Sequence, residues 1–291
     1  MNGEPVRVLG RPPQAVVVVG AGGTGGILIQ QLCRLLYGIA ELSEHARDAP
    51  RLVDDEDEEA FDPYLAGTPP LLIVDGDKVE PYNLRRQFFI DGDAGQNKAV
   101  VLAERYSAAF GLAVSAYPHY LTPRTSKDDL DEVLPTQSVV VGAVDNAATR
   151  RLLHQHLDRY PDVVYLDSGN AGVPATDHGR ASELEAGDAG YDGQVVCGAR
   201  VDHHKVLPFP AEVFPDLIEV EDPEDRLPTE IPCGDAIVSN PQRQVTNVLA
   251  ATVLLSYLTP ILTEGVVPNS LTFFDARKGY LRSQRAATLA D

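Results

Sequence analysis

Apolar residues fall into short unbroken runs along much of this chain, and glycine or a polar residue follows most runs. The four clearest runs lie at 16–19, 71–74, 139–144 and 163–166, and the strand predicted from the last ends at Asp167. Such runs, rich in valine and leucine, are typical of strands that are buried on both faces of a parallel sheet. Apolar residues at helical spacing fill longer segments at 27–37, 99–110, 146–157 and 244–258. This alternation of strands and helices predicts a doubly wound α/β fold.

The remaining segments are interpreted as additions to one large domain. We expect this domain to cover residues 15–282, with a short tail at 1–14 and a frayed end at 283–291. An acidic insertion at 41–70 and a proline-rich crossover at 205–232 interrupt it. Further short strands are expected at 113–117, 193–197, 270–275 and 279–282.

A glycine-rich turn follows the first apolar run and precedes the first helix. Gly20, Gly22 and Gly25 fit the pattern GxGxxG, and Gly23 lies inside it. Glycine allows the backbone to turn tightly and to approach a phosphate, which then binds the amides at the helix N-terminus. The pattern alone fits any dinucleotide-binding enzyme, and it also fits a tight turn without a ligand.

The acidic residue after the second run narrows the choice of ligand. Asp75 stands at the end of the run 71–74, where a carboxylate can hold ribose hydroxyls. In a dehydrogenase that acid lies about 20 residues past the glycines, whereas here the separation from Gly25 is 50 residues (75 minus 25). Polar residues that a dehydrogenase does not explain then follow, namely Asn83, Arg86, Gln87 and Lys98. Two cations and two amides suit a triphosphate, although Arg86 and Lys98 also fit a solvated charged surface.

These motifs occur in an order that is similar to that of the ThiF/MoeB/ubiquitin-activating (E1-like) family of adenylyltransferases. The resemblance covers most of residues 15–175. The short acidic chain most resembles the ThiF-like proteins of the PRTRC plasmid system within this family. The residues that carry the resemblance are Asp75, Asp77, Val79, Asn83, Leu84, Arg86 and Gln87, then Gly95, Gln96 and Lys98, then Asp145 and Asn146.

The resemblance implies a Rossmann-like doubly wound sheet with a mostly parallel N-terminal half and an antiparallel continuation. It implies that Asp75 holds the ribose, with Asp77 and Gln87 in the same nucleotide site. Asn83, Arg86 and Lys98 would contact the phosphates, and Asp145 would bind Mg²⁺ beside them.

The implied activity is the adenylation of the C-terminal carboxylate of a small ubiquitin-like or sulfur-carrier-like protein, with ATP and Mg²⁺. The family usually acts as a homodimer, and an arginine at the start of the partner subunit can complete the site; Arg7 and Arg11 are weak candidates for that role here. Two other functions fit the residues. One is an NAD-dependent Rossmann oxidoreductase, and the other is a non-catalytic nucleotide-binding scaffold.

The chain has three cysteines, at 33, 197 and 233. They are too few for a disulfide framework or for two CxxC pairs, so we expect no structural zinc. Cys33 and Cys197 lie in apolar segments and are predicted to be core residues. Cys233 lies between Pro232 and Gly234 in a loop that resembles the one where ThiF-type proteins carry an acyl-accepting thiol. It is therefore either a nucleophile, with Arg243 as a candidate for lowering its pKa, or a plain loop cysteine.

The net charge is −19, from 24 basic minus 43 acidic residues. This charge argues against nucleic acid or an anionic membrane as a partner. With no unbroken apolar run of membrane-spanning length and no signal pattern, the sequence favours a cytoplasmic protein. The acidic block at 54–59 fits a solvated loop or a docking strip for a basic protein. His154 and His156 are expected to be surface residues.

Overall fold

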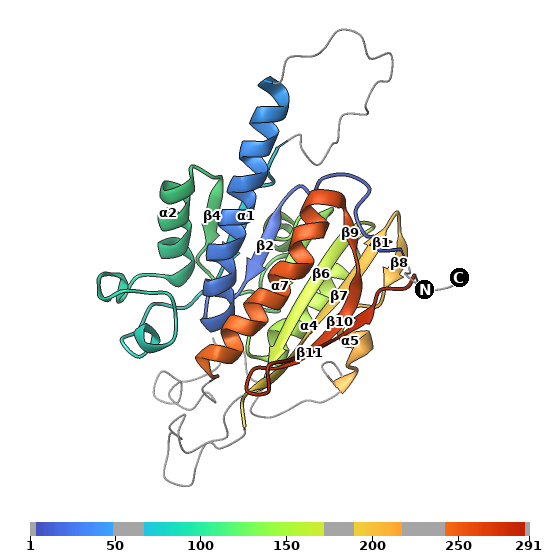
Figure 1. The fold of residues 1–291 in the computed structure, drawn as a ribbon. Helices are drawn as coiled ribbons and strands as arrows, with labels where there is room; N and C mark the ends of the chain where they lie inside the picture. The colour runs from blue at the N-terminus through green and yellow to red at the C-terminus, as the bar shows by residue number, and fades with distance from the viewer. Residues whose placement is uncertain (1–3, 49–66, 172–188, 217–241, 289–291) are drawn as a thin grey trace.

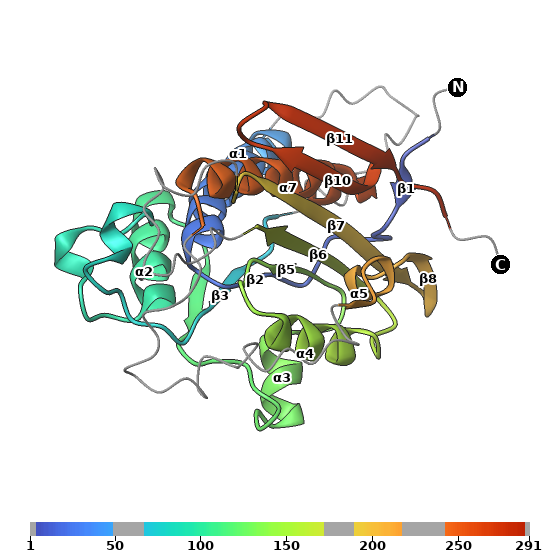
Figure 2. The same cartoon turned by 90° about the horizontal axis from the view of Figure 1, so that it is seen from below.

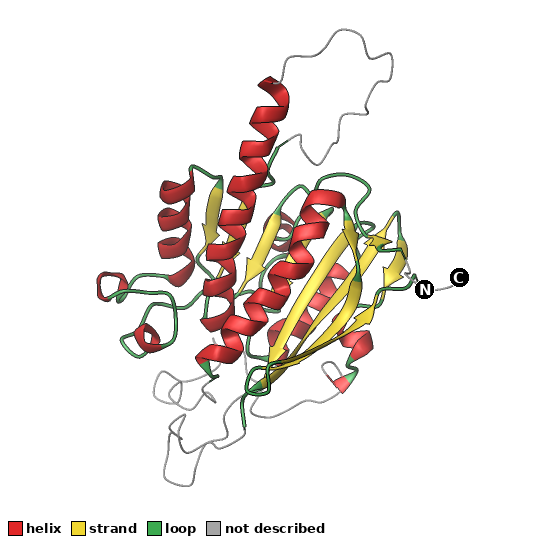
Figure 3. Ribbon diagram, viewed as in Figure 1, coloured by secondary structure: helices red, strands yellow, loops and turns green. Residues whose placement is uncertain are grey.

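The computed structural model describes residues 4–48, 67–171, 189–216 and 242–288, and a large mixed sheet forms its centre (Figures 1 and 3). The strand order is β11-β10-β7-β6-β5-β2-β3-β4, and β8 pairs with β7 beside this path. The strands are β2 (Val16–Val19), β3 (Leu71–Val74), β4 (Val114–Tyr117), β5 (Ser138–Gly142), β6 (Val163–Asn170), β7 (Asp192–Val201), β8 (His204–Leu207), β10 (Asn269–Asp275) and β11 (Tyr280–Arg285).

The sheet changes direction at β7. Strands β4, β3, β2, β5 and β6 are parallel to one another, whereas β7 pairs antiparallel with β6, and β10 and β11 continue antiparallel beyond it. The predicted fold class, a doubly wound sheet with an antiparallel continuation, is confirmed.

Helices cover both faces of the sheet, as the two perpendicular views show (Figures 1 and 2). In β2, Val16 and Val18 belong to the hydrophobic core beneath α1, α2 and α7, whereas Val17 and Val19 belong to the core beneath α3, α4 and α5. All four valines are buried because a strand directs successive side chains to opposite faces. The helices are α1 (Gly23–Asp48), α2 (Lys98–Phe110), α3 (Lys127–Val133), α4 (Ala147–Leu157), α5 (Pro210–Val213) and α7 (Gln244–Glu264).

Several elements are longer than the sequence pattern predicts. Helix α1 continues to Asp48 and so enters the insertion expected at 41–70. Strand β11 continues to Arg285, past the expected domain end at 282. Residues 1–14, which were expected to be a tail, include strand β1 (Val6–Arg7), and β1 pairs with β9 (Val266–Val267). The added residues of β1 and β11 form through strand pairing, which local patterns do not record.

Helix α7 is the one described helix that is long and apolar enough to cross a membrane, by length and composition only. More than half of its most apolar stretch is buried inside the protein. Tyr257 on this helix shares a hydrogen bond of 2.7 Å with Thr272 of β10. The buried face of α7 therefore belongs to the packed core above the antiparallel half of the sheet.

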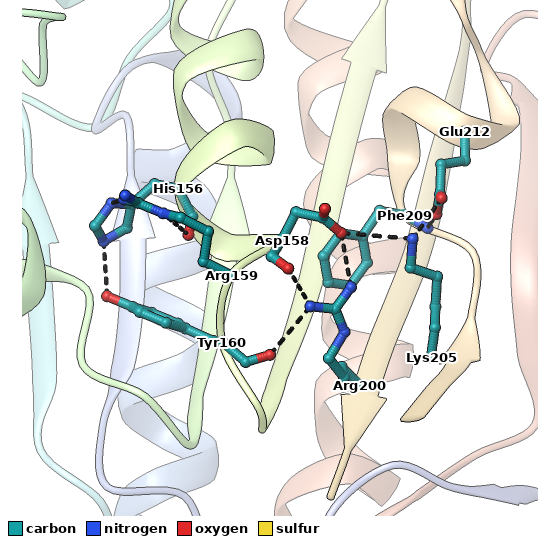
Figure 4. Close-up of polar contacts among 8 residues, drawn as sticks. All are labelled: His156, Asp158, Arg159, Tyr160, Arg200, Lys205, Phe209 and Glu212. Carbon is teal, nitrogen blue, oxygen red and sulfur yellow. Dashed lines mark hydrogen bonds and ion pairs between the residues drawn. The ribbon is translucent and has the colours of Figure 1, made fainter. Parts of the chain in front are cut away.

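A polar cluster closes the end of the sheet where the parallel strands begin (Figure 4). Arg200 of β7 forms an ion pair of 2.7 Å with Asp158 and donates hydrogen bonds to the carbonyl oxygens of Asp158 and Tyr160. Lys205 of β8 pairs with Glu212 of α5 at 2.5 Å. Both cations lie over the Phe209 ring. These contacts fasten β7, β8 and α5 to the connection between α4 and β6.

The expectation that His154 and His156 are surface residues is wrong for His156. Its side chain is buried, with Nε2 2.7 Å from the Tyr160 hydroxyl oxygen. His154 is half-buried and stacks edge-on against Phe209. Residues Thr149, Leu153 and His156 recur at spacings of four and three, which places His156 on the buried face of α4.

Candidate functional site

A pocket opens at the carboxyl ends of β2, β3, β5 and β6, where the strand order reverses around β2. Doubly wound sheets bind ligands at this position, because the loops after adjacent strands diverge there. The pocket brings together nearly all the residues that the sequence analysis selected. Its lining includes Gly20, Gly22, Gly23, Asp75, Asp77, Arg86, Gln87, Lys98 and Asp145.

The glycine loop is compact because its backbone atoms lie against each other. Gly20 has a φ of +100°, and a Cβ at this position would meet the Ala143 carbonyl oxygen at 2.6 Å. A Cβ on Gly25 would lie 1.8 Å from the carbonyl oxygen of Gly20. These approaches direct the first turn of α1 into the pocket, where its partial positive charge favours an anion. Gly25 supports the loop from behind and does not line the pocket.

Asp75 joins the end of β3 to the glycine loop. Its Oδ2 accepts a hydrogen bond of 2.6 Å from the Ala21 amide, and its Oδ1 accepts one of 2.8 Å from the Asp77 amide. Burial raises the pKa of this carboxyl to about 6, although nearby Lys98 opposes the rise. The same carboxyl group that was predicted to hold ribose therefore also fixes the loop that would hold phosphate.

Lys98 lies at the first position of α2 and points back to the end of β3. Its Nζ forms an ion pair of 2.8 Å with Asp77 Oδ2, and Asp77 Oδ1 also accepts a hydrogen bond from the Tyr120 hydroxyl. Burial lowers the pKa of the Lys98 ammonium, but the carboxylates of Asp75 and Asp77 outweigh this effect and the net shift is upward. Lys98 is thus a buried, charged and oriented cation.

The motif at 95–98 has a structural explanation in Asn97. Its Nδ2 donates to the carbonyl oxygens of Asp75 and Asp77, at 2.8 and 3.1 Å, and its Oδ1 caps α2 by accepting from Val100 N. One side chain therefore ties the start of α2 to the end of β3. This contact places Lys98 beside the two carboxylates.

The other predicted phosphate residues divide into two groups. Arg86 and Gln87 line the pocket, and the Oε1 atom of Gln87 is buried without a hydrogen-bond partner among the described residues. Asn83 lies outside the pocket lining; it is buried, and its Oδ1 accepts a hydrogen bond of 2.8 Å from Glu80 N. In this conformation Asn83 shapes the turn that presents Arg86, and its predicted contact with phosphate stays a prediction.

Asp145 is exposed at the pocket, three residues past the end of β5. Arg150 of α4 holds the adjoining backbone, because its Nη2 donates to the carbonyl oxygens of Val144 and Ser168, at 2.6 and 2.9 Å. Its Nε also pairs with buried Asp167 at 2.9 Å. Arg150 therefore positions the segment that carries Asp145, and it was not selected from the sequence.

The sequence analysis missed a second set of polar residues that line the pocket and bond to one another. Thr24 donates to Asn247 Oδ1 at 3.2 Å, and Asn170 Nδ2 donates to Thr24 Oγ1 at 2.9 Å and to Asn247 Oδ1 at 3.1 Å. All three residues line the pocket. The available signals were a polar residue within a glycine loop and an asparagine on the buried side of the apolar α7.

The cysteines divide as expected where the structure describes them. Cys33 and Cys197 are fully buried, which confirms that they are core residues, and burial raises the pKa of both thiols. Cys233 and the acidic block at 54–59 lie outside the described residues. Arg243 is buried, stacks 4.1 Å from the Tyr191 ring centroid and donates a hydrogen bond to the Ala189 carbonyl oxygen.

The fold and the pocket define a Rossmann-like α/β protein with a glycine-loop site. A model of the ThiF family matches residues 64–278, which is more than half of the chain. The chain therefore belongs to the ThiF family, and the resemblance found in the sequence is confirmed at this level.

Two curated relatives match the chain over 142 residues, which is 48% of its length. One is the SAMP-activating enzyme E1 of Haloferax volcanii, at 34% identity and 39% coverage of that protein. The other is the sulfur carrier protein adenylyltransferase of Thermus thermophilus, at 32% identity and 40% coverage. The aligned region thus spans about two fifths of the length of these relatives.

Solved structures share the fold at low sequence identity. Escherichia coli MccB with ATP superposes with a TM-score of 0.54 at 15% identity, covering 94% of this chain and 64% of that one. The SeMet PaaA structure gives a TM-score of 0.53 at 15% identity, covering 95% of this chain and 65% of that one. At this identity the likeness concerns the fold alone.

Gly25→Ala should disrupt the glycine loop, whereas Gly26→Ala should be tolerated. The added Cβ at 25 overlaps the Gly20 carbonyl oxygen, but at 26 its nearest atom, the Ala21 carbonyl oxygen, is 3.5 Å away. We expect Gly25→Ala to lower the free energy of unfolding by about 3 kcal/mol and Gly26→Ala to change it by less than about 1 kcal/mol. Urea denaturation of the two variants measures both values, and equal stabilities would contradict the packing described.

The carboxyl group of Asp75 should titrate near pH 6 and not near its ordinary value of 3.8. Because the folded state holds this proton more tightly than the unfolded chain, the contribution of Asp75 to stability falls as the pH rises from about 4 to about 6. Carboxyl ¹³C NMR of the aspartates, assigned with Asp75→Asn, measures the titration. A midpoint near 4 would show that burial does not control this group.

Proposed function

We propose that this protein is an adenylyltransferase that uses ATP and Mg²⁺ to activate the C-terminal carboxylate of a small ubiquitin-like or sulfur-carrier-like protein. One observation supports the proposal above the others. Asp75, the carboxylate predicted to hold ribose, lines the same pocket as the glycine loop, the cations Arg86 and Lys98, and Asp145. The names of the two curated relatives are consistent with this activity.

The reaction joins the AMP part of ATP to a carboxylate: an oxygen of the carboxylate bonds to the α-phosphorus, and the bond to pyrophosphate breaks. The chain supplies orientation and charge for this transfer. Backbone amides at the start of α1 would hold phosphate oxygens, and Arg86 and Lys98 would stabilise the negative charge that develops on them. Lys98 is already charged and held by Asp77, so it needs little reorganisation.

Gln87 gives an independent test of whether a nucleotide fits this pocket. Its buried Oε1 lacks a hydrogen-bond partner among the described residues, which is costly unless a ligand or water supplies a donor. Asp145 is exposed at the same pocket and would ligate Mg²⁺, which in proteins often takes only one or two carboxylates beside phosphate oxygens and waters. Among the described residues no group of three or more metal-ligating side chains occurs, so phosphate oxygens and waters would supply most of the ligands beside Asp145.

The two alternative functions fit the site less well. An NAD-dependent oxidoreductase leaves Lys98 and Arg86 without a role beside the pocket. A non-catalytic scaffold leaves Arg150 and the placement of Asp145 unexplained. We further propose a cytoplasmic homodimer, as the sequence resemblance implies, and the PRTRC branch stays a prediction. Arg7 donates a hydrogen bond to the carbonyl oxygen of Glu264, at the C-terminal end of α7. The pocket of the same chain lies at the other end of this helix, beside Asn247.

ATP with Mg²⁺ should raise the melting temperature, and NAD should not. A ligand that binds only the folded state at 100 times its Kd stabilises that state by about 2.7 kcal/mol. Thermal unfolding followed by circular dichroism measures the shift, and ATP–pyrophosphate exchange with a candidate small ubiquitin-like protein measures the activity. Greater stabilisation by NAD would favour the oxidoreductase, and binding of ATP without exchange would favour the scaffold.

Asp145→Asn should lower pyrophosphate exchange on the order of 100-fold, because it removes the proposed Mg²⁺ ligand at the transferring phosphate. Its fold should remain, since Asp145 is exposed. Asp128→Asn, which removes an exposed carboxylate from α3, is the matched control and should keep full exchange. Normal exchange in Asp145→Asn would place the metal elsewhere.

Cys233→Ser should separate adenylation from a later thiol step, in which the thiolate attacks the acyl carbon, forms a thioester and releases AMP. The variant should keep pyrophosphate exchange, because none of the pocket residues changes, and should lose a reductant-sensitive adduct with the protein substrate. Cys197→Ser is the control and should keep the adduct, with some loss of stability from a hydroxyl in the core. If both variants keep the adduct, the thioester does not form on Cys233.

A further inference from the structure

The outermost strand of the antiparallel half, β11, differs from the rest of the chain in charge. Residues 276–290 contain four basic residues and no acidic one, in a chain with 43 acidic and 24 basic residues. The basic residues are Arg277, Lys278, Arg282 and Arg285. Lys278 pairs with Asp275 at 2.9 Å, whereas Arg282 and Arg285 lie within β11 itself.

The edge of β11 is open among the described residues. β11 ends the strand order and pairs only with β10, and Figure 2 shows it at the rim of the sheet. All six of its residues are exposed, including Tyr280 at 46% and Leu281 at 55%. Alternate backbone N–H and C=O groups of such a strand point outward and can pair with a further strand.

The side chains of β11 suit an acidic strand. Tyr280 and Arg282 project to one face and Leu281 and Arg285 to the other, because direction alternates along a strand. In many proteins, charged residues on an edge strand prevent pairing with other strands. That role does not explain why two large apolar side chains are exposed beside the charges of β11. Cross-strand pairs of opposite charge and of apolar residues both stabilise a sheet.

A second copy of this chain is a poor occupant of the edge. Pairing β11 with itself would bring four arginines, two from each copy, onto a six-residue ladder. Like charges placed opposite one another destabilise strand pairing. The partner should therefore carry the opposite charge.

We propose that the outer edge of β11 binds an extended acidic segment of another protein by strand addition. In the antiparallel arrangement, the segment carries acidic residues three positions apart, opposite Arg285 and Arg282. Two apolar residues then follow, opposite Leu281 and Tyr280. Backbone hydrogen bonds supply much of the affinity, and the side chains supply the specificity. This binding does not depend on the adenylation reaction.

The probe is a fluorescent peptide with the central sequence Glu-Thr-Thr-Glu-Val-Val, flanked by threonines, and fluorescence anisotropy up to about 1 mM protein measures its binding. Its lysine counterpart should bind at least tenfold more weakly. Two further peptides carry N-methyl groups on alternate amides, at odd or at even positions. Strand addition requires that one of these two loses binding, because its inward amides can no longer donate.

The protein variants test the location. Arg282→Glu/Arg285→Glu should weaken binding of the acidic peptide at least tenfold. Arg34→Glu/Arg124→Glu changes the net charge equally at exposed positions on α1 and on the loop before α3, and it should bind as the unaltered protein does. Melting temperatures establish that both variants fold, and the single variant Arg282→Gln replaces the first if it does not.

Three results would overturn the proposal. They are no binding of the acidic peptide, equal loss of binding in both double variants, and survival of binding with both N-methylated peptides. A fourth result would overturn the proposal by assigning the edge to a second copy of the chain. In that case, β11 amides of the protein alone would become protected from hydrogen exchange as its concentration rises. Sedimentation would also show a dimer, and the β11 double variant would abolish it.

Discussion

The close approach of two glycines is the constraint on which the site depends. Gly25 packs against the carbonyl oxygen of Gly20, and Gly20 packs against that of Ala143, with no room for a Cβ at either position. This packing sets the start of α1 directly over the ends of β2 and β5. Asp75 then accepts a hydrogen bond from the Ala21 amide within the same loop. Sheet, helix and acid are therefore fixed as one unit, so the amides at the start of α1 and the Asp75 carboxylate face the pocket together.

A strongly acidic protein needs a cation in a pocket that is to bind phosphate, and the charges beside the glycine loop provide it. Two carboxylates, Asp75 and Asp77, lie next to the buried Lys98, and the three groups stabilise one another as a set. A buried ammonium without them would tend to lose its proton. With them, the site retains a cation in a region that the overall charge would make negative. The Tyr120 hydroxyl, bound to Asp77, completes the set from the loop after β4.

Local patterns in the sequence predicted the parts of the site that lie within one motif. The glycine loop, Asp75, Arg86, Gln87, Lys98 and Asp145 were all identified, and all but Gly25 of the loop line the pocket. The hydrogen-bonded set of Thr24, Asn170 and Asn247 was not, because its members are 77 to 223 residues apart. The role of Arg150 was hidden for the same reason, since its contacts form only when α4 packs on β6. The length of α1 was underestimated because its last turns are mostly polar, so they lack the apolar spacing that marks its start.

The two halves of the sheet differ in charge, and this difference decides how binding at β11 should depend on salt. The parallel half holds the pocket, whereas the antiparallel half ends in a basic strand on a protein of net charge −19. At a distance, an acidic partner meets the field of the whole protein and is repelled. At physiological ionic strength that field decays over about 8 Å, so contact with β11 is governed by the arginines nearest to it. Lower salt therefore has two opposing effects: it strengthens the local attraction and it strengthens the long-range repulsion. Binding at the basic strand should then depend weakly on ionic strength, in contrast to the steep salt dependence of a partner attracted by the whole protein.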